Sequence, residues 1–142
     1  MVIAIDGYEA NVSKRVGIGR YAYEILKHLF AELRTQNSNP SKREEVSVRV
    51  YLPNPPQADM PEETEWWQYR VFKPRSLWTF IGLPLALWLD RPQADVVFSP
   101  THYVPRFVAT ARVMSIMDLS YLEFPQMFRA KDLHQLVHWT AY

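Results

Sequence analysis

The residues best suited to chemistry are a threonine, a histidine and two aspartates, and each follows a short apolar run. They are Asp6, Thr101, His102 and Asp118. If the runs are parallel strands, their carboxyl ends meet at one edge of a sheet, where open α/β folds bind ligands. Carboxylate, hydroxyl and imidazole groups gathered there could bind and orient a polar substrate. We therefore expect these side chains to share one cleft.

Each of these residues also has a plainer interpretation. Asp6 could organise its own loop, Asp118 could cap the turn that follows it, and His102 could be a loop histidine whose hydrogen bonds are satisfied. For any one residue alone the plain interpretation is favoured. For the group, next to an anion-binding turn, we favour function.

That turn is Gly17-Ile18-Gly19-Arg20, which opens a long amphipathic helix. Glycines let the backbone turn without a Cβ penalty, so N–H groups at the helix start can point outward. The helix dipole adds partial positive charge there, which favours an anion. The simpler alternative is a tight turn into the helix with no ligand.

The same glycines do not predict a dinucleotide site. Residues 17–22 fit the G-x-G-x-x-A pattern, but that fingerprint requires a strand leading directly into the first glycine. Eleven residues, 6–16, intervene. The acid expected after the second strand is also missing, since the run 46–52 ends in Pro53. NAD and FAD are therefore excluded.

Composition narrows the class of protein further. Sixteen basic and fifteen acidic residues are spread along the 142-residue chain, which leaves no basic stripe for nucleic acid. Cysteine is absent, so disulfides and thiol catalysis are excluded and a cytoplasmic location is expected. The chain begins in a strand-like run, so we expect no signal peptide. His134 and His138 have metal-ligand spacing but no third ligand, and no metal site is predicted.

One apolar stretch, Leu77 to Leu89, could be mistaken for a membrane span. Its thirteen uncharged residues reach only about 20 Å as a helix, against a hydrocarbon core of about 30 Å. A glycine and a proline in its middle predict two short helical pieces. We favour a buried helix. The alternative is an exposed face of Trp78, Phe80 and Trp88 that rests on a membrane or a lipid-linked substrate.

Hydrophobic periodicity supplies the elements that would position these residues. Strands are expected at 2–5, 46–52, 67–72, 94–98 and 112–117, and helices from Ile18, within 77–89 and from Met127. Polar or proline-rich connections are expected at 36–45 and 53–65. The alternation in 46–52 predicts a strand away from the sheet centre with one face less buried. The alternating order predicts one α/β domain with a doubly wound, mainly parallel sheet.

Three ordered blocks resemble the N-terminal half of a family 4 ("group 1") retaining glycosyltransferase of GT-B fold. The blocks are IAIDGYEANVSKRVGIGRYAYEIL, VVFSPTHYVP and SIMDLSYLEFPQMF, and the resemblance runs over residues 1–142. It implies a Rossmann-like domain that binds a saccharide or lipid-linked acceptor. A second domain, expected beyond Tyr142, would hold a nucleotide sugar as co-substrate. No metal or other cofactor is implied.

The resemblance also implies roles for single residues. Gly17, Gly19 and Arg20 would face the donor's diphosphate, Asp6, Thr101 and His102 would bind the acceptor, and Asp118 would lie at the transferred sugar as the catalytic residue. Met117 stands where the family usually carries histidine, and methionine cannot donate a hydrogen bond.

Two rival functions come from other classes. One is a non-catalytic glycan- or lipid-binding module that lacks the donor domain. The other is an interaction protein whose uncovered apolar surface pairs with a second copy. Contact with the inner face of a membrane is compatible with the first of these and with the enzyme.

Overall fold

The fold was analysed in a computed structural model that describes residues 1–38 and 46–140. It is an α/β protein built on a five-stranded, all-parallel sheet with the strand order β3-β2-β1-β4-β5. The strands are β1 (Val2–Asp6), β2 (Ser47–Leu52), β3 (Trp67–Val71), β4 (Val96–Ser99) and β5 (Ala111–Met114). The order reverses between β1 and β4, which is where such sheets bind ligands. The predicted doubly wound, Rossmann-like fold is confirmed.

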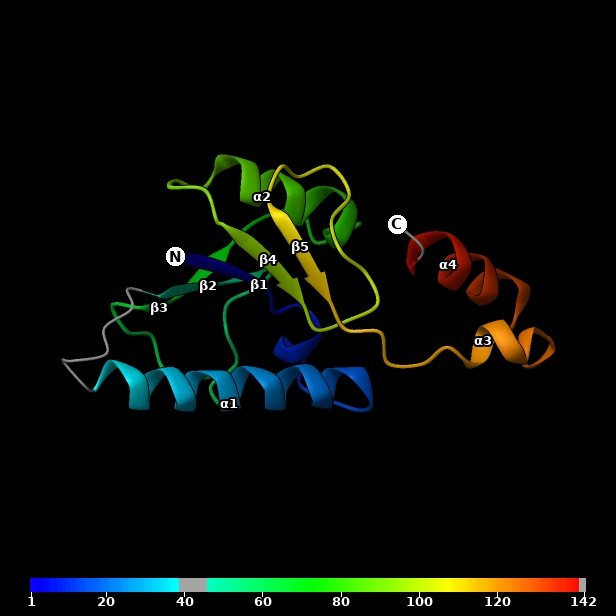
Figure 1. Cartoon of the computed structure of the whole chain (residues 1–142), viewed down its shortest axis with the longest axis horizontal. Helices are drawn as coiled ribbons and strands as arrows, with labels where there is room; N and C mark the ends of the chain where they lie inside the picture. Colours follow the sequence, from blue (N-terminus) through cyan, green and yellow to red (C-terminus); the bar gives the residue numbers. More distant parts are fainter. Residues whose placement is uncertain (39–45, 141–142) are drawn as a thin grey trace.

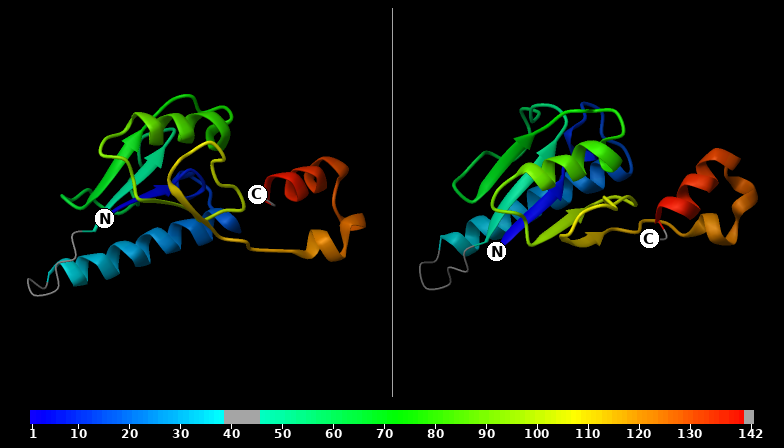
Figure 2. Two further views of the ribbon diagram at one scale, coloured as in Figure 1. Left: turned by 45° about the horizontal axis from the view of Figure 1, so that its top comes forward. Right: turned by 90° about the horizontal axis from the view of Figure 1, so that it is seen from above.

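Helices cover both faces of the sheet (Figure 1). The long helix α1 (Ile18–Asn37) lies on one face, and η3 (Trp78–Gly82) with α2 (Leu83–Leu89) lies on the other. A short 3-10 turn, η1 (Glu9–Asn11), joins β1 to the loop before α1. The remaining helical segments, α3 (Ser120–Glu123), η4 (Pro125–Met127) and α4 (Ala130–Thr140), stand apart from the sheet at the end of an extended chain (Figures 1 and 2).

Two apolar layers hold the sheet to its helices. Beneath the sheet, Leu26 and Phe30 of α1 pack with Val50 and with Trp67, whose ring meets Phe30 edge-on at 5.3 Å. Above the sheet, a second apolar layer packs η3 and α2 against the strands. Its members include Ala4, Tyr51, Trp78, Leu83, Leu87 and Val97. Both faces of the central strands are therefore buried, as expected for a parallel sheet.

The expectation that β2 has a less buried face is wrong. The strand does lie away from the centre, between β1 and β3, but Arg49 is only 8% exposed and Tyr51 only 1%. Both polar groups are satisfied by Asp90, which accepts hydrogen bonds from Tyr51 Oη at 2.7 Å and Arg49 Nη1 at 3.3 Å. Burial is tolerated because these partners replace water.

The apolar stretch forms the two predicted helical pieces, a π-helical turn followed by α2. One side of it is core, since Trp78, Leu83 and Leu87 are buried. Phe80 is half-buried, whereas Trp88 is 65% exposed. The favoured buried helix is thus correct for one face only. Within the described residues, no helix combines the length and apolar character needed to cross a membrane.

Several element boundaries differ from expectation. β4 spans 96–99 instead of 94–98, and the last helix, α4, begins at Ala130 instead of Met127. The last strand ends at Met114 instead of Met117, although the Ser115 amide still donates to the Ser99 carbonyl at 3.1 Å. β5 is an edge strand with mostly exposed side chains, so nothing extends the ladder further. Helix α1 runs on to Asn37, into the expected connection; the rest of that connection, from residue 39 to 45, lies outside the described residues, as does Ala141.

Candidate functional site

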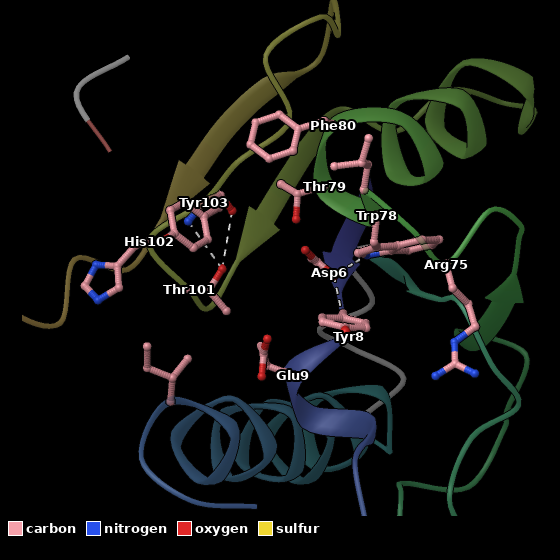
Figure 3. A pocket seen from close by; sticks show the side chains of 12 residues that line it. Asp6, Tyr8, Glu9, Arg75, Trp78, Thr79, Phe80, Thr101, His102 and Tyr103 are labelled. Carbon is pink, nitrogen blue, oxygen red and sulfur yellow. Dashed lines mark hydrogen bonds between the residues drawn. The ribbon is translucent and has the colours of Figure 1, made fainter. Parts of the chain in front are cut away.

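A cavity of about 340 Å³ opens at the carboxyl ends of β1 and β4, at the reversal of strand order. Side chains from β1 and the turn after it, from α1, from η3 and from the loop after β4 line it (Figure 3). The lining residues are Asp6, Tyr8, Glu9, Ile18, Arg75, Leu77, Trp78, Thr79, Phe80, Thr101, His102 and Tyr103. The predicted convergence of Asp6, Thr101 and His102 is found here.

Asp6 is the best-anchored polar group of the cavity and is only 4% exposed. Its Oδ1 accepts hydrogen bonds from the Tyr8 amide at 3.1 Å and from Trp78 Nε1 at 2.9 Å. Burial raises the pKa of Asp6 to about 6, and these two hydrogen bonds oppose the rise. No described residue donates to Oδ2, which leaves that oxygen for a ligand.

A second carboxylate, Glu9, enters the cavity from η1. It is half-buried, and burial raises its pKa above the ordinary value. The nearby charge of Glu9 also contributes to the raised pKa of Asp6. Two carboxylates in one cavity disfavour an anionic ligand at this end and favour a ligand rich in hydroxyl donors.

Thr101 and His102 follow β4 and are almost fully buried. Thr101 Oγ1 lies 2.9 Å from Ser99 Oγ and accepts a long hydrogen bond from the Tyr103 amide at 3.4 Å. His102 Nδ1 is buried, and no hydrogen-bond partner for it lies among the described residues. Burial lowers the pKa of His102, which favours the neutral imidazole, and the charge of Asp118 opposes this. A ligand could supply the missing partner of Nδ1.

Aromatic side chains form much of the cavity wall. Tyr8, Trp78, Phe80 and Tyr103 surround the Asp6 carboxylate, and Arg75 lies at the opposite end from His102 (Figure 3). The sequence pattern indicated Trp78 and Phe80 as core residues or as part of a face that rests on a membrane or a lipid-linked substrate, and neither was included among the candidate site residues. Tyr8 and Glu9 could have been suspected because they come two and three residues after Asp6, at the end of the first strand.

The glycine turn lies beside the cavity, since Ile18 belongs to the lining. Gly17 has φ of 50°, which favours glycine. The Gly19 amide was expected to point outward to an anion. It instead donates a hydrogen bond to the Val16 carbonyl at 3.0 Å. Its small size serves packing, because an added Cβ would lie 2.9 Å from the Glu9 carbonyl oxygen.

Arg20, the third residue expected near the diphosphate, is exposed and does not line the cavity. Its guanidinium pairs with Glu24 at 2.6 Å, one turn further along α1. The structure therefore places the backbone of the glycine turn beside the cavity, but not this side chain.

Asp118 lies outside the cavity, so the expected cluster is incomplete. It is exposed, and both carboxylate oxygens accept hydrogen bonds from Ser120: Oδ1 from the amide at 2.7 Å and Oδ2 from Oγ at 2.8 Å. These bonds lower the pKa of Asp118. In this conformation Asp118 organises its own turn, because β5 ends before reaching it.

The described residues contain no group of three His, Cys, Asp or Glu side chains that could hold a metal ion. His134 and His138 do lie close, with ring centroids 4.2 Å apart, but they make only a pair.

Comparison with known proteins adds no assignment. No model of a protein family matches the chain, and neither a curated protein nor a solved structure matches it. What the cavity could bind must therefore be argued from its own geometry.

Proposed function

We propose that this chain is the acceptor-binding N-terminal part of a retaining glycosyltransferase of family 4, and that the cavity is its acceptor site. Asp6, Thr101 and His102 would contact the acceptor. A nucleotide sugar would be the co-substrate, held mainly by a second domain. The fold supports the proposal at the level of architecture, since a parallel sheet with a cavity at its switch point suits either domain of such an enzyme.

The observation that carries the proposal is the Asp6 carboxylate, buried among aromatic rings with one oxygen left for a ligand. Sugars present hydroxyl donors at their edges and apolar C–H surfaces on their faces. Carboxylate oxygens and a neutral imidazole match the hydroxyl donors, and the aromatic rings of the cavity wall match the C–H faces. A cavity of about 340 Å³ is large enough for about one to two sugar rings.

In the proposed reaction an acceptor hydroxyl attacks the anomeric carbon of the donor, the bond from that carbon to the diphosphate breaks, and the hydroxyl proton passes to the oxygen of the departing diphosphate. Asp6 would orient the hydroxyl by accepting its hydrogen bond at Oδ2. With a pKa of about 6, this carboxyl is mostly ionised at neutral pH and can play that part. The positive end of α1 at Gly17 would help to stabilise the leaving diphosphate.

The test uses the polypeptide encoded by the whole reading frame that contains this chain. It is incubated with common nucleotide hexoses and a panel of saccharide and lipid-linked acceptors, and release of nucleoside diphosphate is measured. We expect acceptor-dependent release that Asp6→Asn reduces at least tenfold. Absence of release from every donor would contradict the proposal.

A second candidate is a non-catalytic glycan- or lipid-binding module. Two observations favour it: Asp118 is engaged by Ser120 outside the cavity, and Met117 stands where a histidine donor is usual. Saccharide binding by the chain, together with inactivity of the whole polypeptide, would select this candidate.

A further inference from the structure

The helical segment formed by η3 and α2 carries a row of exposed apolar side chains, here called the apolar stripe. Its members are Leu77, Ile81, Leu85, Trp88 and Leu89, whose exposed fractions run from 40% to 65%. The residues recur every three or four positions, so they lie along one side of the segment. Because Leu83 and Leu87 of the same segment are buried in the layer that packs on the sheet, the exposed stripe lies on the other side of the segment. Figures 1 and 2 show α2 at the outside of the molecule, on the face of the sheet opposite α1.

The opposite side of this segment is already core. Trp78, Leu83 and Leu87 are buried against the sheet. The segment is therefore apolar all round, whereas a surface helix normally presents polar residues to water. An apolar stripe of this kind marks a surface that meets another phase or molecule.

Positive charge stands at both ends of the stripe. Lys73 and Arg75 precede it, and Arg91 follows it. Among the described residues no carboxylate pairs with these three cations, and the only acid from 73 to 91 is Asp90. Its carboxylate is turned to Arg49, Arg70 and Tyr51. The surroundings of the stripe are therefore electropositive.

We propose that the apolar stripe lies on the surface of an anionic lipid bilayer. An interfacial helix combines an apolar face with flanking cations that meet lipid phosphates, and tryptophan is favoured at that depth. Trp88, at 65%, is the most exposed member of the stripe. The segment would lie flat on the bilayer, with Lys73 and Arg91 among the headgroups.

A second copy of the chain fits the stripe less well. A stable dimer buries about 800 Å² on each partner, which five partly exposed side chains do not supply. Pairing two stripes would also bring two sets of three cations together. A bilayer removes both difficulties, because its phosphates neutralise the cations.

The stripe and the cavity are continuous, since Leu77 and Arg75 belong to the cavity lining as well. On a bilayer the cavity would open beside the headgroups. If the proposed function holds, this placement selects a lipid-linked saccharide as the acceptor.

The test is flotation of the 142-residue chain with vesicles, without donor or acceptor, so that its outcome is independent of any transferase activity. One set contains equal parts of phosphatidylglycerol and phosphatidylcholine, and the other contains phosphatidylcholine alone. We expect flotation with the first set, weakened by salt, and little with the second. Lys73→Gln with Arg91→Gln should weaken binding about 25-fold, or about fivefold for each cation.

The apolar contribution is tested with the double variant Ile81→Ser and Trp88→Ser, which should not float. Its matched control, Leu122→Ser with Met127→Ser, removes apolar side chains that are 62% and 79% exposed but lie outside the stripe. Circular dichroism checks that both variants fold. Failure of the unsubstituted chain to float, equal flotation with both vesicle sets, or equal loss in the control would overturn the proposal. A dimer seen by light scattering and abolished by Ile81→Ser with Trp88→Ser would also overturn it, in favour of a second copy.

Discussion

Trp78 Nε1 donates a hydrogen bond of 2.9 Å to Asp6 Oδ1, although 72 residues separate the two positions. The bond ties η3, on the upper face of the sheet, to the carboxyl end of β1 (Figure 3). It holds a buried carboxylate in place and fixes an aromatic wall of the cavity at the same time. Fold stability and the geometry of the site therefore depend on one contact.

Trp78→Phe should destabilise the protein by about 3 kcal/mol, because it removes a hydrogen bond to a buried carboxylate and leaves unfilled volume. The pKa of Asp6 should rise further, since this bond lowers it. Urea unfolding measures the loss. The control is Trp88→Phe at a position that is 65% exposed, where the change should stay within about 0.5 kcal/mol. Equal losses would contradict the assigned contact.

Asp6 should make stability fall as pH rises from about 4 to about 6. Its pKa is raised from 3.8 in the unfolded chain to about 6 in the folded protein, so the folded state binds the proton more tightly. The stability that Asp6 contributes is fully present below its pKa in the unfolded chain and is lost as pH passes its pKa in the folded protein. The loss is about 3 kcal/mol at most.

The pH effect is isolated with Asp6→Asn, which keeps an oxygen for Tyr8 and Trp78 but cannot ionise. Urea unfolding of both proteins is measured across the range, and their difference removes the opposing contributions of Asp59 and Asp118, whose pKa values are lowered. The free energy of unfolding of Asp6→Asn should increase relative to that of the unsubstituted protein as pH rises to 7. A difference that is independent of pH would show that burial does not shift the Asp6 pKa.

Gly19→Ala should cost about 1 to 2 kcal/mol even though alanine favours helices. The added Cβ would lie 2.9 Å from the Glu9 carbonyl oxygen, so η1 must shift and carry Glu9 with it. Arg20→Ala is the neighbouring control. It removes an exposed ion pair with Glu24 and a distant cation–π contact with the Tyr23 ring at 6.0 Å, together worth less than about 1 kcal/mol. Thermal unfolding compares the two. A more stable Gly19→Ala variant would rule out the close packing of η1 on α1.

Asp90→Ala should cost about 3 to 5 kcal/mol, because it removes the carboxylate that balances the buried charge of Arg49, leaving that guanidinium the Pro92 carbonyl at 2.6 Å, and because it removes the acceptor of Tyr51. Glu62→Ala provides the matched comparison. The Glu62 carboxylate pairs with Arg34 at 3.6 Å, and both side chains are 68% exposed, so its loss should cost less than about 1 kcal/mol. Chemical denaturation measures the stability loss of both variants. Similar losses would be inconsistent with a buried cluster of Asp90, Arg49 and Tyr51.

Periodicity was sufficient to predict the architecture. Alternating apolar runs and one strongly amphipathic helix define a parallel sheet with helices on both faces, and the structure has that fold. The burial of Arg49 was not predictable, because it depends on hydrogen-bond acceptors more than 40 residues away, the Asp90 carboxylate and the Pro92 carbonyl. The end of β5 was missed because an edge strand lacks the second neighbour that would extend it.

The candidate site was predictable where strand ends determine it. Asp6 is the last residue of β1, and Thr101 and His102 follow β4. The two strands are adjacent in the sheet, so topology alone brings these residues together. Trp78 could not be placed from sequence, since its role depends on how η3 packs over β1. Asp118 was expected in the cluster, but the chain leaves the sheet before reaching it.

Saccharide binding in the cavity is the property on which the proposed function depends. The most direct measurement is amide NMR of the 142-residue chain titrated with saccharides, with Tyr8→Ala as the test variant and Tyr21→Ala as the control. The two tyrosines are 37% and 38% exposed, but only Tyr8 lines the cavity. We predict shifts at Asp6, Tyr8 and Thr101 that weaken at least tenfold in Tyr8→Ala and persist in Tyr21→Ala. Shifts located elsewhere, or none with any saccharide, would contradict the claim.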